Sequence, residues 1–212
     1  MSYRVLDLEN DPRKGHFSYF HNFANPYVGV TMDVDITDFM AARKRAGLPF
    51  FLPFLYCAGR AANRVPQLRQ RILNDSAVEF DRCDTSHTVL LDDGSYCYCR
   101  LDCMQPFRNF LPEAEAKQEQ AKLAPSIDDG DEGLSLLFVS SLPWLHYRSF
   151  TQPTPVPADS NPRITWGKYE AQNGRITIPV TLLANHALVD GLHLAAFYKA
   201  LDEELQTLTE SI

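Results

Sequence analysis

The sequence predicts an α+β fold in which a mixed β-sheet and helices form layers. Three observations support this fold class. Segments with strand character recur along the chain, helical segments fall between them without strict alternation, and 45% of the 212 residues are hydrophobic. That length suits one large domain or two tightly fused halves, and no internal repeat or low-complexity tract divides it.

The first quarter of the chain contains signals for both element types. Residues 3–9 indicate a short strand or extended segment, and Asp11 is a candidate N-cap for a helix that has Pro12 at its first position. Residues 27–36 alternate and are rich in β-branched side chains, which is typical of a strand. Residues 49–66 are apolar on most of their surface, so we expect a buried helix there.

The middle of the chain has a different sequence pattern, in which turn residues separate short strand candidates. The acidic, glycine-containing segment 125–133 is expected to be a surface loop that can move, and the proline-rich segment 151–162 a second loop. The other expected elements are strands over 77–84, 87–93, 95–102 and 134–144, and helices over 36–47 (Thr37 being its candidate cap) and 107–124.

The last third has the clearest signals. Residues 163–172 and 175–184 flank Asn173-Gly174, the pair that most strongly indicates a β-hairpin. Pro179 cannot donate a backbone hydrogen bond, so it predicts a bulge or an outward-facing edge position. After Gly191, apolar residues recur at the spacing of one helix face, namely at Leu194, Phe197, Tyr198, Leu201, Leu205 and Leu208.

Charge and cysteine content exclude several classes of protein. A formal charge of -7 and a pI near 5.3 disfavour nucleic acid or an anionic membrane as partner. No apolar run is long enough to span a bilayer, and the N-terminus lacks the apolar region of a signal peptide, so we expect a cytoplasmic protein. The five cysteines include no CxxC pair, so they predict free thiols rather than a zinc site.

The segment NHALVDGLH, residues 185–193, contains the best candidate for chemistry. His186 lies between a strand and a tight corner, where a histidine can act as a general base near neutral pH. Asp190 is a natural helix N-cap, and a polar corner histidine is the alternative to a catalytic one. A metal site of His186, Asp190 and His193 would need a continuous helix through the corner, which Gly191 disfavours.

Several separated segments, in order, resemble those of the chloramphenicol acetyltransferases. The corner, with His186 four residues before Asp190-Gly191 and then His193, is similar to the end of that family's sequences. The other similar segments are RKGHF at 13–17, VDIT at 34–37, FVSSLPWLHYRSF at 138–150 and NPRITWGKY at 161–169. Residues 85–133 match poorly. The resemblance implies a single domain over residues 1–212, folded as a two-layer sandwich of a mixed β-sheet packed against helices.

The resemblance also implies roles for three residues. His186 matches the base that removes a proton from a substrate hydroxyl as this oxygen attacks the thioester of acetyl-CoA. Ser140 corresponds to the serine whose hydroxyl stabilises the tetrahedral oxyanion, and Thr165 to a threonine that positions a water molecule. Ser140 can instead be a strand-end hydroxyl that bonds its own backbone, and Thr165 an ordinary β-branched strand residue.

Further residues are implied in supporting and binding roles. Asp190 would pair with Arg13 and hold the corner in shape, although a simple helix cap and a solvated arginine are the alternative. Lys168 and Tyr169 align with residues that line the coenzyme A tunnel. Trp144 either contributes to that surface or is a buried indole. Acetyl-CoA would be a co-substrate, with no permanently bound cofactor and no metal.

The family resemblance implies a homotrimer with active sites at the subunit interfaces. Three departures concern the acceptor: Asn185 replaces a histidine, Phe20 a tyrosine that bonds the acceptor hydroxyl, and Val28 a phenylalanine of the acceptor pocket. Three functions are therefore considered. The first is an O-acetyltransferase that acts on chloramphenicol as a resistance enzyme, and the second is an acetyltransferase for another hydroxyl or amine compound. The third is an inactive trimeric relative that binds coenzyme A.

Overall fold

A mixed sheet of seven strands forms the centre of the molecule. The computed structural model describes the backbone of residues 1–212 and every side chain except that of Asp131. The strands are β2 (Tyr27–Asp35), β5 (Asp84–Leu90), β6 (Tyr96–Leu101), β7 (Leu136–Ser141), β8 (Arg163–Trp166), β9 (Glu170–Gln172) and β10 (Arg175–Asn185). They pair in the order β2-β10-β8-β7-β5-β6, with β9 added beside β10.

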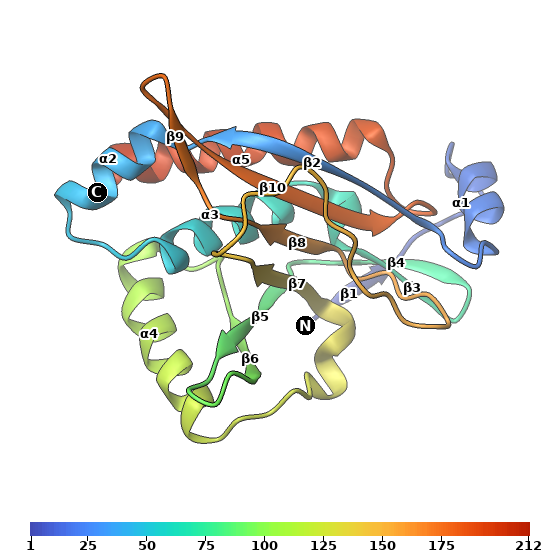
Figure 1. Ribbon diagram of the computed structural model, residues 1–212. Coiled ribbons are helices and arrows are strands. Elements are labelled where there is room, and N and C mark those ends of the chain that lie inside the picture. The colour runs from blue at the N-terminus through green and yellow to red at the C-terminus, as the bar shows by residue number, and fades with distance from the viewer.

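The α-helices are α1 (Lys14–His21), α2 (Thr37–Arg45), α3 (Phe51–Asn63), α4 (Phe107–Leu123) and α5 (Gly191–Ser211). Helices α2 to α5 cover one face of the sheet, and α1 lies beyond one end of it (Figure 1). The fold class predicted from the sequence, a mixed sheet packed against helices, is therefore confirmed. None of the described helices combines the length and the apolar composition that crossing a bilayer requires.

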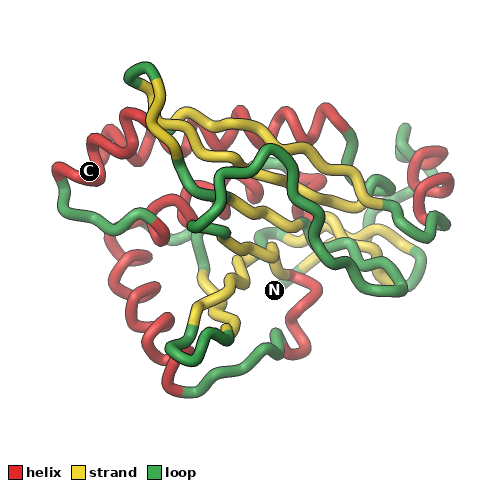
Figure 2. Tube along the Cα trace, in the orientation of Figure 1, coloured by secondary structure: helices red, strands yellow, loops and turns green.

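The core lies between the sheet and the helices. Helix α3 is buried along nearly its whole length, and the ring of Phe54 meets Trp166 of β8 edge to face, with centroids 5.0 Å apart. The opposite face of the sheet carries no helix. Figure 2 shows the long loop between β7 and β8 crossing this open face. The open face is therefore where polar side chains of the strands can meet a ligand.

A second, three-stranded sheet was not predicted. It contains β1 (Tyr3–Val5), β3 (Gln70–Leu73) and β4 (Ser76–Phe80) in the order β1-β4-β3. Strands β3 and β4 are joined by Asn74 and Asp75, both with positive φ (49° and 60°), the conformation of a tight hairpin turn. The pairing of β1 with β4 joins segments far apart in sequence, so no local pattern could indicate it.

Three local predictions need correction. Asp11 does not cap α1: its Oδ1 accepts from the backbone N–H of Arg13 (2.7 Å), and the helix begins only at Lys14. Helix α2 starts at Thr37, whose backbone N–H donates to Asp35 Oδ1 (2.9 Å), so Asp35 takes the capping role expected of Thr37.

Pro179 is also placed differently from the prediction. It lies in β10, a central strand, opposite Asp33 of β2. Its carbonyl accepts from Gly167 N–H (3.0 Å), and the N and C=O of one strand residue point to the same side. Pro179 therefore lies opposite Gly167, just beyond the end of β8 at Trp166, and the pair lacks only the reciprocal bond to Gly167 O that the missing N–H would donate. The hairpin at Asn173-Gly174, with φ of 53° and 76°, is confirmed.

Candidate active site

The corner between β10 and α5 is closed by a reciprocal helix cap. Asp190 Oδ1 accepts from Leu192 N–H (3.1 Å), and His193 Nδ1 accepts from Asp190 N–H (3.1 Å). The predicted cap at Asp190 is confirmed. Because its Nδ1 accepts in this cap, the neutral His193 ring carries its proton on Nε2. Among the residues whose side chains are described, no group of three His, Cys, Asp or Glu is placed to hold a metal ion.

The imidazole of His186 is fixed from three directions. Its backbone N–H donates to Pro26 O (2.6 Å), its Nδ1 lies 2.8 Å from Val189 O, and the Phe20 ring stacks on it with centroids 3.9 Å apart. A carbonyl oxygen can only accept, so Nδ1 carries the proton of the neutral ring. Nε2 is then the unprotonated nitrogen, which is the form a general base needs.

Two polar residues hold the backbone around His186. Arg13 Nη1 donates to Leu188 O, and its Nε lies 3.4 Å from Asp190 Oδ2. Asn185 is buried, donates to Asp159 O (3.0 Å) and accepts from Ala187 N–H (3.0 Å). Asn185 therefore bonds one backbone group of the turn and one of the β7–β8 loop, which explains how an amide fits where the resemblance implies a second histidine.

Ser140 and Thr165 belong to a row of hydroxyl groups on the open face. Ser140 Oγ lies 2.9 Å from Thr165 Oγ1. Thr165 is in register with Thr181 of β10, and Thr181 with Thr31 of β2, whose hydroxyl oxygens are 2.7 Å apart. Tyr147 closes the row by donating to Thr165 O (2.8 Å). Sequence reasoning missed Thr31, Thr181 and Tyr147, because only the strand register brings them together.

A cavity of about 320 Å³ opens beside Ser140. Its walls come from β5, β6, β7, β8, the β7–β8 loop and the segment between α4 and β7. They include the polar residues Ser86, Asp129 and Arg163 and the aromatic residues Tyr98, Phe138 and Phe150. Because Ser140 lines this cavity, a carbonyl oxygen held by its hydroxyl would belong to a molecule bound here.

His186 and Ser140 do not meet within one chain. Ser140 is in register with Thr165, and Thr165 with Thr181, five residues before His186 on the chain. With about 3.3 Å per strand residue and about 4.8 Å between strands, the Cα atoms of Ser140 and His186 are roughly 19 Å apart. His186 and the hydroxyl row therefore lie in two separate parts of the chain, the His186 half-site and the Ser140 half-site.

The remaining predicted residues divide between the two half-sites. Phe20 and Val28 lie on the His186 side, since Phe20 stacks on the imidazole and Val28 pairs with Ala184, and neither lines the cavity beside Ser140. Lys168 and Tyr169 are exposed just beyond the end of β8, where Lys168 N–H donates to Leu145 O (2.7 Å). Trp144 lies in the turn after β7 and is 66% exposed, so the alternative of a buried indole is wrong.

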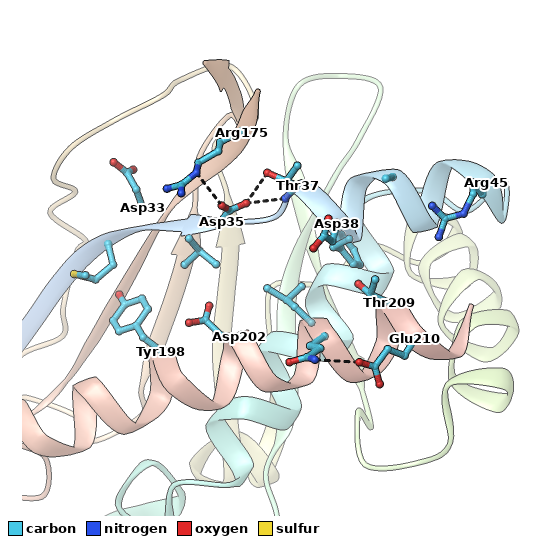
Figure 3. A pocket seen from close by; sticks show the side chains of 16 residues that line it. Asp33, Asp35, Thr37, Asp38, Arg45, Arg175, Tyr198, Asp202, Thr209 and Glu210 are labelled. Atoms are coloured by element: carbon cyan, nitrogen blue, oxygen red, sulfur yellow. Dashed lines mark hydrogen bonds and ion pairs between the residues drawn. The ribbon is translucent and has the colours of Figure 1, made fainter. Parts of the chain in front are cut away.

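A recess larger than this cavity lies elsewhere, between β2, α2 and α5 (Figure 3). It measures about 950 Å³ and is rich in carboxylates, of which Asp35 bonds to Thr37 and lies 4.0 Å from Arg175. It contains none of the residues predicted to be functional. Volume alone therefore does not locate the site in this protein.

Comparisons with known proteins agree with this geometry. Chloramphenicol acetyltransferase 3 of Escherichia coli is 27% identical over 209 residues, covering 96% of this chain and 97% of that protein. A solved chloramphenicol acetyltransferase superposes with a TM-score of 0.84 at 28% identity, covering 96% and 100% of the two chains. The dihydrolipoamide acetyltransferase of Azotobacter vinelandii shares the fold, with a TM-score of 0.69, 19% identity and coverage of 92% and 87%.

The profile of the family described as chloramphenicol acetyltransferase matches residues 1–202, nearly the whole chain. A catalytic-type histidine at the strand-to-helix corner and a hydroxyl row over a cavity are features that an acyltransferase can use. The protein belongs to the chloramphenicol acetyltransferase family and is an acyltransferase.

Proposed function

We propose that the protein transfers the acetyl group of acetyl-CoA to a hydroxyl group of a small molecule. The observation that carries this proposal is the orientation of His186, whose Nδ1 is committed to Val189 O while Nε2 is left as an acceptor. His186 Nε2 would take the proton of the acceptor hydroxyl as its oxygen attacks the thioester carbon. The imidazolium then returns this proton to the departing thiolate of coenzyme A.

Ser140 would stabilise the intermediate between these two steps. The tetrahedral carbon carries a negative oxygen, and the Ser140 hydroxyl donates to it from the cavity wall. Thr165 lies 2.9 Å from Ser140 Oγ, is fully buried and would orient that hydroxyl or a water molecule beside it. No acyl-enzyme is required, because acceptor and thioester react directly in a ternary complex.

The separation of the half-sites supports an assembled enzyme. We propose a homotrimer in which His186 of one copy faces the cavity and the hydroxyl row of its neighbour. Acetyl-CoA would bind as a co-substrate, with Lys168 meeting its phosphates and the exposed rings of Trp144 and Tyr169 covering its adenine. Asp190 and Arg13 act as positioning residues for the base. The protein would work in the cytoplasm, where acetyl-CoA is available.

The identity of the acceptor is a second and more specific part of the proposal. Chloramphenicol is the leading acceptor because the curated relatives carry that name, and its acetylation would make the protein a resistance enzyme. A specific observation favours a different hydroxyl or amine compound as the second candidate. Phe20, which stacks on His186, has no hydroxyl to offer an acceptor, and Val28 is smaller than an aromatic residue.

A steady-state thiol-release assay with acetyl-CoA and chloramphenicol tests the proposal, with a panel of other alcohols and amines in parallel. Acceptor-dependent release of coenzyme A that disappears in His186→Ala is expected. Turnover of another acceptor only would select the second candidate. Coenzyme A binding without turnover of any acceptor, unchanged in His186→Ala, would contradict the proposal and leave an inactive relative.

A further inference from the structure

The cavity beside Ser140 contains a carboxylate that no cation neutralises. Asp129 Oδ1 accepts from Ser86 Oγ (2.5 Å), and among the described side chains Asp129 forms no ion pair. Arg163 also lines the cavity, but its charge is balanced by Asp159, to which Nη1 and Nη2 donate over 2.8 and 2.6 Å. The cavity therefore has a net negative charge on the wall formed by Asp129.

Aromatic rings line the cavity around this carboxylate. Tyr96 and Tyr98 stack with centroids 6.0 Å apart, and Phe138 and Phe150 contribute further ring surface. Burial raises the pKa of Tyr98, and the charges of Tyr96 and Asp129 raise it further, so the Tyr98 ring stays neutral at physiological pH. Neutral aromatic faces beside a carboxylate attract organic cations.

Asp129 is held in this position by the backbone of its own segment. Tyr98 N–H donates to Ser126 O (2.8 Å), Gly130 N–H donates to Asp128 Oδ1 (2.8 Å), and Asn161 Nδ2 donates to Gly133 O (2.9 Å). The acidic segment 125–133, whose role the sequence did not explain, thus has contacts to the rest of the domain on both sides of Asp129. Its charge is directed into the cavity by the Ser86 hydrogen bond.

The two sides of Ser140 differ in charge. Lys168 lies beyond the end of β8, on the side suited to the phosphates of coenzyme A. Asp129 lies on the opposite side, bonded to Ser86, which pairs with Phe138 two residues before Ser140. A molecule bound between Asp129 and Ser140 therefore occupies the side of the cavity left for the acceptor.

We infer that this cavity selects a cationic acceptor. It would be an amino alcohol whose ammonium group meets Asp129 and whose apolar body lies against Tyr98 and Phe150. Its hydroxyl would reach the thioester carbon held beside Ser140, where His186 of a second copy can take the proton. The inference rests on the proposed acetyl transfer at Ser140. It narrows the acceptor class, since a neutral amide-bearing alcohol such as chloramphenicol leaves the Asp129 carboxylate without a counter-charge in a partly enclosed site.

Binding measurements with two matched probes test this inference. N,N-dimethylphenylethanolamine is cationic at neutral pH and has no N–H to acetylate, and its analogue with carbon in place of nitrogen has nearly the same shape without the charge. Calorimetric titration of the wild-type protein should show the cation binding about tenfold more tightly than the neutral analogue. Asp129→Asn, whose amide oxygen can still accept from Ser86, should reduce this ratio to near one.

Asp128→Asn is the matched control, because it removes one charge from the neighbouring residue, which does not line the cavity. It should leave the tenfold ratio unchanged. Equal affinities in the wild type, a ratio that survives Asp129→Asn, or no binding of either probe at millimolar concentration would overturn the inference. These readouts do not need turnover. Loss of acetyl transfer from every acceptor with the binding preference intact would instead count against the proposed function.

Discussion

The two half-sites of this protein are built in different ways. The His186 corner is assembled mainly from residues close in sequence, with Phe20 and Arg13 added from the N-terminal region. The Ser140 half-site is assembled from strands that are far apart in sequence and joined only by register. Each half is ordered within one chain, and the two are separated by roughly 19 Å. The proposed reaction, which needs both halves, would therefore take place at an interface between two copies.

The largest effect is expected from removing the base. His186→Ala should lower kcat by about 10²- to 10⁴-fold, because no other group is placed to take the acceptor proton. Affinity for acetyl-CoA should stay close to that of the wild type, since the proposed coenzyme residues lie in the other half-site. His16→Ala, which replaces an exposed histidine of α1, is the control and should keep full activity.

The Ser140 half-site should show the next largest effect. Ser140→Ala should lower kcat by about 10²-fold, because the oxyanion loses a preorganised hydroxyl donor. Ser141→Ala changes the same chemistry one residue along β7, where the side chain points to the other face. If both variants have the same steady-state activity, Ser140 has no role in stabilising the oxyanion.

A smaller effect on activity is expected from the support of the base. Arg13→Lys keeps a positive charge near Asp190. Its single ammonium group lacks the planar fork of the guanidinium, so it cannot contact Asp190 and donate to Leu188 O at the same time. We expect kcat to fall by about tenfold, with a lower melting temperature, because the turn before α5 loosens around His186. An unchanged melting curve together with unchanged kcat would show that Arg13 does not position the corner.

Protonation of a residue on the face of β5 opposite the cavity should affect stability rather than turnover. His87 lies in the core, and burial lowers its pKa from 6.5 to about 4. Between pH 6.5 and pH 4, the unfolded chain binds a proton at this residue and the folded chain does not. The free energy of unfolding therefore falls as the pH drops from 6.5 towards 4. The full loss is on the order of 3 kcal/mol.

Urea unfolding at several pH values measures this loss. His87→Asn should be less stable near neutral pH and should lose part of the pH dependence below pH 6.5. His193, whose pKa burial also lowers, keeps its own contribution with the same sign. Identical slopes in the variant and the wild type would mean that folding does not lower the pKa of His87.

The contrast between the half-sites also explains what the sequence could predict. The cap at Asp190, the hairpin at Asn173-Gly174 and helix α5 depend on neighbouring residues, and each was recognisable from local pattern. The row that joins Ser140 to Thr31 depends on three strand pairings, which no local pattern determines. Pro179 was misplaced for the same reason, because only the pairing shows that β8 ends beside it.

The cavity was the least predictable part of the site. Ser86, Tyr98 and Asp129 lie in residues 85–133, the segment whose sequence resembled the family least. Their side chains converge because β5 and β6 pair next to β7, and because segment 125–133 bonds back to Tyr98. The segment whose sequence resembles the family least therefore supplies walls of the cavity that we propose to select the acceptor.

Complementation between two inactive variants tests most directly whether the half-sites come from different copies. His186→Ala keeps an intact Ser140 half-site, and Ser140→Ala keeps an intact base, so the two chains are co-expressed in equal amounts and the mixed assemblies are assayed for thiol release. With random assembly, a shared site receives an intact His186 from one copy in about half of the cases, and an intact Ser140 from its neighbour in about half. About one quarter of the sites, and of the wild-type activity, should therefore be restored. A mixture no more active than the mean of the two variants would show that His186 and Ser140 act within one chain or not together at all.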